Sequence, residues 1–211
     1  MRDRIDPLAD YATALSGPIP DYLLRLERQT YLKTIAPQMM CGPVQGRLLA
    51  LLSRLVRPTR VLEIGTFTGY ATLCLAEGLA PNGRIETIEG DPEIAARAAR
   101  NFAGSPFGDR IDLLRGDAYD LLPTLPGLYD LIFLDGDKRG YPRYLPVLVE
   151  RLRPGGLLIA DNVLWDGKAG RNTTDPTAAN LQTYNQLAAA HPQLSALILP
   201  IRDGLSICRK N

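Results

Sequence analysis

The chain has 211 residues, of which 45% are hydrophobic and 22% charged, enough apolar material for one α/β domain with a full-sized core. Its 24 Lys and Arg nearly balance its 23 Asp and Glu, which argues against a nucleic-acid-binding surface. No apolar run approaches the roughly 18–20 residues that cross a bilayer, and residues 1–7 lack the apolar stretch of a secretory signal, so we expect a cytoplasmic protein with no membrane partner.

Two helices, over residues 21–35 and 45–55, are predicted ahead of any strand. They could cover a site, form a dimer interface or pack on the core, and the sequence alone slightly favours packing. From residue 60 onward strands and helices alternate. The predicted strands cover residues 60–65, 84–89, 111–115, 129–135 and 157–161, and the helices between and after them cover 70–79, 91–102, 119–125, 144–152 and 177–190.

The C-terminal part of the chain has a different pattern. Residues 194–201 and 205–210 are two further strands, and the Asp203-Gly204 pair between them is typical of a hairpin. The whole pattern predicts an α/β fold with a doubly wound, seven-stranded, mostly parallel Rossmann-like sheet that ends in an antiparallel hairpin. We expect one domain over residues 1–211, in which residues 1–57 form a helical cover on the sheet core of residues 58–211.

The turn after the first predicted strand indicates a ligand site. Gly65 and Gly69 bracket this turn, where missing Cβ atoms let a ligand approach the backbone N–H groups of a helix N-terminus. Glu63 precedes the turn, and Glu89 ends the next strand, where a carboxylate accepts hydrogen bonds from ribose hydroxyls. The two glycines alone could serve turn geometry only, but their combination with both carboxylates indicates an adenosine-containing ligand.

The glycine pattern lacks the second glycine of G-x-G-x-x-G, which admits a pyrophosphate in dinucleotide sites. An adenosine ligand without pyrophosphate fits better, and S-adenosylmethionine is the obvious one. Asp117 and Ala118, after the third strand, are well placed to meet an adenine, although an ordinary turn is the alternative.

Oxygen-bearing side chains follow two neighbouring strands. Asp135 ends the fourth strand, and Asp161 and Asn162 end the fifth. Because adjacent parallel strands lie about 4.8 Å apart, these side chains can converge on one ion, and two carboxylates with an amide oxygen suit Mg²⁺, with Mn²⁺ or Ca²⁺ as alternatives. The alternative is that they are helix caps and turn formers.

Cysteine and histidine do not supply a rival site. Cys41, Cys74 and Cys208 are odd in number and far apart, so neither a disulfide framework nor a zinc site is expected, and the last two are expected in the core. The single histidine, His191, precedes a proline at a predicted helix end, which argues against a histidine-based triad.

A divalent ion bound to two adjacent phenolic oxygens would lower the pKa of the attacking hydroxyl and fix its position. Lys138 could then take the proton, because a neighbouring cation and partial burial favour the neutral amine. Methyl transfer is an in-line displacement that depends on positioning. The alternative for Lys138 is a surface lysine paired with Asp137.

These motifs together resemble the cation-dependent catechol and caffeoyl-CoA O-methyltransferases, over a region from about residue 30 to the C-terminus. The similarity rests on residues 61–70 (VLEIGTFTGY), 135–138 (DGDK), 161–165 (DNVLW) with Gly167, and 199–200 (LP) with 203–205 (DGL). The resemblance implies that Asp135, Asp161 and Asn162 hold the metal and that Lys138 is the catalytic base.

The resemblance also implies a cofactor site. Glu89 would bind the ribose, the 65–69 loop would face the methionine part, and residues 39–43 would fold over cofactor and substrate. Members of this family are usually dimers, so a homodimer is expected, with the N-terminal helices and the loop after the fifth strand shaping the acceptor pocket. The full expected set of cofactor-binding residues is Met40, Glu63, Gly65, Phe67, Thr68, Gly69, Ala71, Glu89, Asp117, Ala118 and Asp135.

The sequence departs from the family pattern in three places. Many relatives carry serine where Ala71 stands, and the neighbouring Thr72 could replace that hydroxyl. Many carry an acidic or polar residue near Val44. Residues 165–175 are short and polar and lack the longer basic insertion that plant-type enzymes use with CoA thioesters. These differences bear on the size of the acceptor and not on the reaction class.

The sequence therefore predicts an S-adenosylmethionine- and metal-dependent O-methyltransferase that acts on a small phenolic, catechol-type acceptor. A nicotinamide-dependent dehydrogenase on the same sheet is one alternative, and the absent G-x-G-x-x-G argues against it. A non-catalytic nucleotide-binding protein is the other, and Lys138 beside a complete ligand set argues against it. The physiological acceptor and the methylated position stay open.

Overall fold

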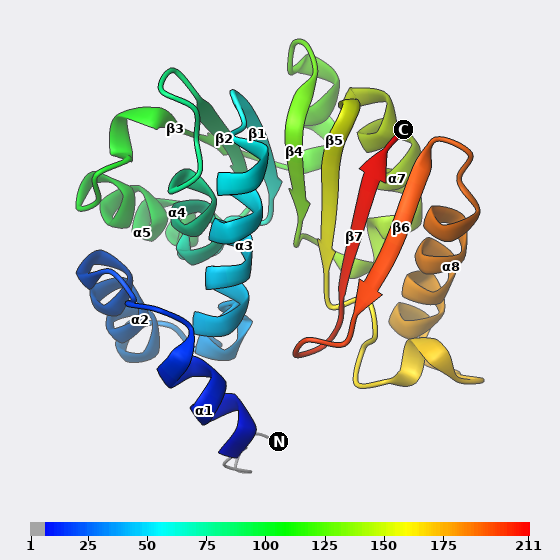
Figure 1. Cartoon of the computed structure of the whole chain (residues 1–211), viewed down its shortest axis with the longest axis horizontal. Coiled ribbons are helices and arrows are strands. Elements are labelled where there is room, and N and C mark those ends of the chain that lie inside the picture. The colour runs from blue at the N-terminus through cyan, green and yellow to red at the C-terminus, as the bar shows by residue number, and fades with distance from the viewer. Residues whose placement is uncertain (1–6) are drawn as a thin grey trace.

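The computed structural model describes residues 7–211, and its strands form one sheet in the order β3-β2-β1-β4-β5-β7-β6 (Figure 1). The first five strands are parallel, β7 runs antiparallel to β5, and β6 antiparallel to β7. The strands are β1 (Arg60–Ile64), β2 (Arg84–Glu89), β3 (Ile111–Arg115), β4 (Tyr129–Leu134), β5 (Leu152–Asp161), β6 (Leu194–Leu199) and β7 (Leu205–Lys210). The predicted doubly wound sheet with an antiparallel C-terminal hairpin is confirmed.

Helices cover both faces of this sheet (Figure 1). They are α1 (Pro7–Leu15), α2 (Asp21–Lys33), α3 (Pro43–Val56), α4 (Tyr70–Ala76), α5 (Pro92–Ala103), α6 (Ala118–Leu121), α7 (Tyr141–Arg151) and α8 (Pro176–Ala190). The side chains of β1 alternate between two cores: Val61 packs with α2, α3, α4 and α5, whereas Leu62 packs with α7 and α8. Cys74 and Cys208 are fully buried in these cores, as predicted. Within residues 7–211, no helix is long and apolar enough to cross a bilayer.

The structure differs from the prediction at several elements, among them α1, α4 and β5. Helix α1 was not predicted, because its Tyr11 and Leu15 are 67% and 66% exposed and give no buried apolar stripe. Helix α4 ends at Ala76 instead of residue 79, where Gly78 packs so closely on α3 that a Cβ there would lie 2.2 Å from the carbonyl carbon of Ser53. Strand β5 begins at Leu152 and includes the Pro-Gly-Gly segment that was expected to separate helix from strand, because a register shift against β4 accommodates it.

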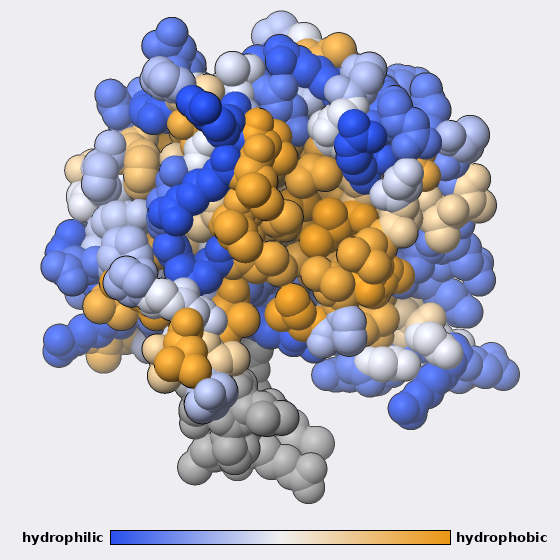
Figure 2. All heavy atoms as spheres, viewed as in Figure 1, coloured by the Kyte–Doolittle hydropathy of each residue, from blue (hydrophilic) through white to orange (hydrophobic). Residues whose placement is uncertain are grey.

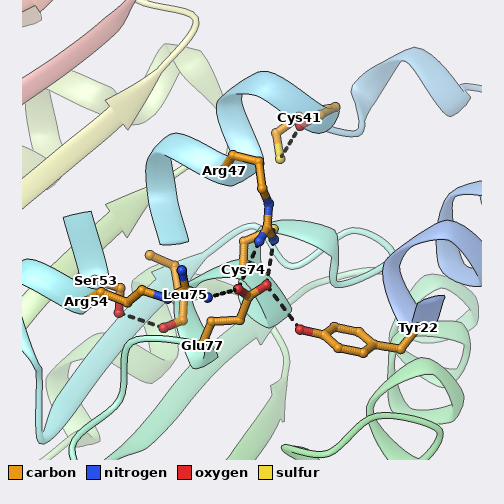
Figure 3. A network of polar contacts seen from close by, with 9 residues as sticks. Tyr22, Cys41, Arg47, Ser53, Arg54, Cys74, Leu75 and Glu77 are labelled. Atoms are coloured by element: carbon orange, nitrogen blue, oxygen red, sulfur yellow. Dashed lines mark hydrogen bonds and ion pairs between the residues drawn. The ribbon is translucent and has the colours of Figure 1, made fainter. Parts of the chain in front are cut away.

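The N-terminal helices are fixed to the sheet core by one buried carboxylate, Glu77 (Figure 3). It pairs with Arg47 (2.5 Å) and Arg54 (2.7 Å) of α3 and accepts a hydrogen bond from the hydroxyl of Tyr22 in α2 (3.1 Å). Its side chain is only 5% exposed. Because a buried charge that loses its partners is strongly destabilising, this network holds α2 and α3 in one position against α4. The segment between these two helices is thereby brought to the carboxyl edge of the sheet.

Candidate active site

The carboxyl ends of β1 and β4 approach each other closely at Gly65. This residue has φ +95°, and a Cβ built on it would lie 2.4 Å from the backbone oxygen of Asp135. The backbone N–H of Asp135 donates to the carbonyl of Ile64 (2.8 Å), so the strand pairing continues into this turn. Only glycine fits here, both for its φ and for the space. Gly65 therefore allows the loop after β1 to lie directly against Asp135 at the end of β4.

Glu89, at the end of β2, is hydrogen-bonded to the loop that follows Gly65. Its Oε2 accepts a hydrogen bond from the backbone N–H of Phe67 (2.8 Å), and its Oε1 accepts from that of Asp91 (2.9 Å). Phe67 has a left-handed φ of +48°. Glu89 is half-buried, so lone pairs on both oxygens stay available to a ligand. The structure thus brings the loop and the predicted ribose-binding carboxylate together.

Glu63 lies beneath this loop and is fully buried. Its Oε2 accepts hydrogen bonds from the hydroxyls of Thr72 and Thr87, while its Oε1 has no partner among the described residues. Burial raises the pKa of this carboxyl to about 8, and the two threonine hydrogen bonds act in the opposite direction. Because Thr72 is used by Glu63, its hydroxyl does not stand in for the serine that Ala71 replaces.

The remaining predicted cofactor residues are buried or make local contacts. The Thr68 hydroxyl accepts from Thr30 of α2 (2.9 Å). A Cβ at Gly69 would meet the ring of Phe102 at 2.3 Å. Ala71 and Met40 are 8% and 5% exposed. The loop therefore packs tightly between α2 and α5 on its inner side.

Asp117 and Ala118 lie beside the end of β2. The N–H of Gly116 donates to the carbonyl of Glu89 (3.0 Å), which holds the two strand ends side by side. Asp117 is exposed and caps α6 by accepting from the N–H of Tyr119 (2.7 Å). Ala118 is 8% exposed. The turn thus has a capping role and also lies next to the predicted ribose-binding carboxylate.

The predicted metal ligands come together at the ends of β4 and β5. The register pairs the residues just before Asp135 and Asp161. Lys138 donates to Oδ1 of Asp135 at 2.5 Å, and both side chains are mostly buried. The alternative pairing of Lys138 with Asp137 is wrong, because the Asp137 carboxylate instead accepts from the backbone N–H of Arg139 (3.2 Å). Asn162 has φ +59° and donates its backbone N–H to Oδ1 of Asp161 (2.7 Å).

Charge in this cluster is closely balanced. Burial raises the pKa of Asp135 to about 6; the Lys138 ammonium acts against this rise, and the nearby Asp161 carboxylate adds to it. The Lys138 Nζ also lies 5.4 Å from the centre of the Tyr141 ring, within cation–π range. The Asp161 carboxylate thus raises the proton affinity of Asp135, and a pair of close carboxylates of this kind favours a bound cation.

Three residues that sequence reasoning missed hold this cluster. Gln45 of α3, 1% exposed, donates its amide to Oδ2 of Asp161 at 2.6 Å. Arg202, in the β6–β7 turn, contacts Gln45 Oε1 at 3.4 Å. The Tyr141 hydroxyl lies 2.9 Å from the carbonyl of Leu134 and 3.1 Å from that of Asp161, bridging β4 and β5. Sequence reasoning assigned a role to none of these three residues.

The metal set itself stays a prediction. Within residues 7–211, no group of three or more His, Cys, Asp or Glu side chains is arranged to hold a metal ion. The predicted set contains two carboxylates, and its third ligand is the amide of Asn162. A site of this kind therefore depends on Asn162 and on the bound acceptor to complete its oxygen ligands.

Known proteins share both this fold and this sequence pattern. A family model described as O-methyltransferase matches residues 14–211. Catechol O-methyltransferase of Niastella koreensis is 37% identical over 181 residues, covering 81% of this chain and 82% of that protein. Caffeoyl-CoA O-methyltransferase 1 of Eucalyptus globulus is 31% identical over 178 residues, covering 79% and 72%.

Solved structures agree. The O-methyltransferase from Bacillus cereus in complex with SAH has a TM-score of 0.91 at 28% identity, with 97% of each chain covered. The SAH-bound methyltransferase of Podospora anserina has a TM-score of 0.90 at 28% identity, covering 98% of this chain and 94% of that one. From its sequence and its fold, this chain belongs to the O-methyltransferase family.

Proposed function

We propose that this O-methyltransferase transfers a methyl group from S-adenosylmethionine to one hydroxyl of a catechol-type diol, with a divalent cation bound at Asp135, Asp161 and Asn162. The observation that carries the proposal is the pair of neighbouring buried carboxylates with Lys138 beside them. They lie next to the Gly65–Gly69 loop, which Glu89 holds at Phe67 and which suits an adenosine ligand. Catechol O-methyltransferase relatives at 35–37% identity support the acceptor class.

The cofactor half fits the residues present. Glu89 has free lone pairs for ribose hydroxyls, and it holds the Gly65–Gly69 loop beside it through the hydrogen bond from the Phe67 N–H. Glu63 carries a buried oxygen without a partner, beneath the same loop. We assign this oxygen of Glu63 the role of accepting a hydrogen bond from the cofactor's methionine part. With the ribose at Glu89, we place the adenine beside Ala118, because the turn that contains Ala118 lies next to Glu89.

The metal half also fits by its chemistry. Asp135, Asp161 and Asn162 are hard oxygen donors, and neither a thiolate nor an imidazole is among them, so Mg²⁺ is favoured over zinc. A bound Mg²⁺ would supply Lewis acidity to the phenolic oxygen. In this scheme Lys138 accepts the hydroxyl proton at Nζ. The Asp135 carboxylate and the Tyr141 ring then stabilise the resulting ammonium.

Two variants test this assignment. Lys138→Ala and Asp161→Ala are each expected to lower methyl transfer to a catechol about 100-fold or more, because a general base and a metal ligand are removed. Binding of S-adenosylhomocysteine, measured by calorimetry, should persist in both, since the adenosine half is untouched. Turnover within threefold of the wild type in either variant would contradict the site assignment.

We also propose that the enzyme is a homodimer. Apolar side chains gather over α3 and over the strands beside it (Figure 2), on a face of β7 and β6 that no helix covers in Figure 1. The pairing aligns Ile159, Ile207 and Leu197 across three strands, and Leu197 is 55% exposed. Leu51 and Leu55 of α3 are 53% and 73% exposed. Light scattering should give twice the chain mass for the wild type and a smaller mass for Leu197→Glu, whereas a monomeric wild type would refute the proposal.

A further inference from the structure

Arg202 adopts an unusual backbone conformation at the edge of the candidate site. It lies in the turn between β6 and β7 with φ +52°, a left-handed region that long L side chains rarely occupy. Such residues persist where their surroundings or their function require them. Its side chain is exposed, so burial of its methylene groups does not account for the conformation.

The guanidinium of Arg202 has few partners for its five donors. Its contacts are Gln45 Oε1 and the carbonyl of Gln38, both neutral oxygens and both at 3.4 Å. Among the side chains of residues 11–211, no carboxylate lies within 4.0 Å of it. Its chain neighbour Asp203 is directed elsewhere, since it accepts from the backbone N–H of Asp166 (2.6 Å). Arg202 is therefore a cation with unused hydrogen-bonding capacity.

This cation lies close to the reaction centre. The side chain of Gln45 alone separates it from Asp161, because one end of the Gln45 amide contacts Arg202 and the other donates to Asp161. An acceptor held by its diol at Asp135 and Asp161 would bring its far substituents within reach of this guanidinium.

We propose that Arg202 recognises a carboxylate on the acceptor, so that the preferred substrates are catechols with an acid group, of the dihydroxybenzoate or dihydroxycinnamate kind. This inference rests on the proposed function and names its substrate class. A planar guanidinium binds a carboxylate through two parallel hydrogen bonds. A doubly charged phosphate fits less well, because Asp135, Asp161, Asp166 and Asp203 all lie near the site and would repel it.

The test compares two acceptors that differ in charge. The ratio of kcat/KM for 3,4-dihydroxybenzoate to that for 3,4-dihydroxybenzamide is measured with Mg²⁺ for the wild type, Arg202→Gln, Arg202→Lys and Arg84→Gln. Arg84 is a matched control, since it is a half-exposed arginine paired with Asp112 on β3 at the other end of the strands. We expect the ratio to exceed 1 in the wild type and to fall about tenfold or more in Arg202→Gln, mainly through KM.

We expect Arg202→Lys to keep part of the preference and Arg84→Gln to keep all of it. A ratio in Arg202→Gln within twofold of the wild type, with the amide still methylated, would overturn this inference and leave the proposed function intact. A wild type with a higher kcat/KM for the amide than for the acid would also overturn this inference and leave the proposed function intact. Absence of methyl transfer to both acceptors and to catechol would overturn the proposed function, and this inference with it.

Discussion

Replacing Gln45 by leucine removes the amide that joins α3 to Asp161 and leaves a side chain of similar size. Gln45 and Asp161 are 1% and 3% exposed, so water has little access to replace the lost donor. A hydrogen bond to a charged group contributes about 1.5–3 kcal/mol. We expect Gln45→Leu to lower the free energy of unfolding by about 2 kcal/mol, which for a chain of this size lowers Tm by roughly 4–8 °C.

The matched control is Ser53→Ala on the same helix. Ser53 is also fully buried, but its hydroxyl donates a hydrogen bond to a neutral group, the carbonyl of Leu75 at 2.6 Å (Figure 3). Loss of this hydrogen bond should lower the free energy of unfolding by about 1 kcal/mol. Urea denaturation with EDTA present measures both variants. Mn²⁺ binding, followed by electron paramagnetic resonance, should weaken about tenfold or more in Gln45→Leu and not in Ser53→Ala. A loss below about 0.5 kcal/mol in Gln45→Leu, together with unchanged Mn²⁺ affinity, would refute the reasoning.

Three further outcomes follow from the site. The pKa of Glu63 in the folded state is about 8, above its unfolded value, so its contribution to the free energy of unfolding is full below about pH 4.3 and disappears as pH rises through 8. In cofactor-free protein, the free energy of unfolding measured with urea should therefore decline less over this pH range in Glu63→Gln than in the wild type. Because Asp135 has a raised pKa of about 6, Mn²⁺ affinity measured by calorimetry should fall as pH decreases below 6, and a constant affinity between pH 5 and 7 would contradict its role as a ligand. Gly65→Ala should lower the free energy of unfolding by well over 2 kcal/mol, because the new Cβ would overlap the Asp135 backbone. Gly167→Ala is the control: Gly167 has φ +73° and open space around it, so the loss should be about 1 kcal/mol. Equal losses in the two variants would contradict the role given to the close contact at Gly65.

Much of the fold could be predicted because it is coded locally. The apolar run of β4 and the glycine turn after β1 each lie within a few consecutive residues. The hydrophobic period that distinguishes a strand from a helix is likewise read from a short stretch of sequence. The start of α5 is coded locally in the same way, since Asp91 accepts from the N–H groups of Glu93 and Ile94 and Pro92 stands at the first helical position. Local signals of this kind also located Asp135 and Asp161 at neighbouring strand ends.

The side chains that hold the site could not be predicted in this way. Gln45 reaches Asp161 across 116 positions, and Arg202 reaches Gln45 across 157. Neither spacing has a periodic or turn-forming pattern, and Arg202 stands in a hairpin turn, where an arginine normally faces solvent. The continuation of β5 through Gly155 was missed because glycine and proline usually end an element, whereas here a register shift absorbs them.

The measurement that tests the central claim most directly is methyl transfer from labelled S-adenosylmethionine to a catechol panel, with Mg²⁺ and again with EDTA. We predict activity with Mg²⁺ that EDTA removes and that added Mg²⁺ restores. Activity that EDTA does not change would contradict the metal mechanism assigned to Asp135, Asp161 and Asn162. Cofactor binding without methyl transfer to any diol would contradict the catechol-type acceptor.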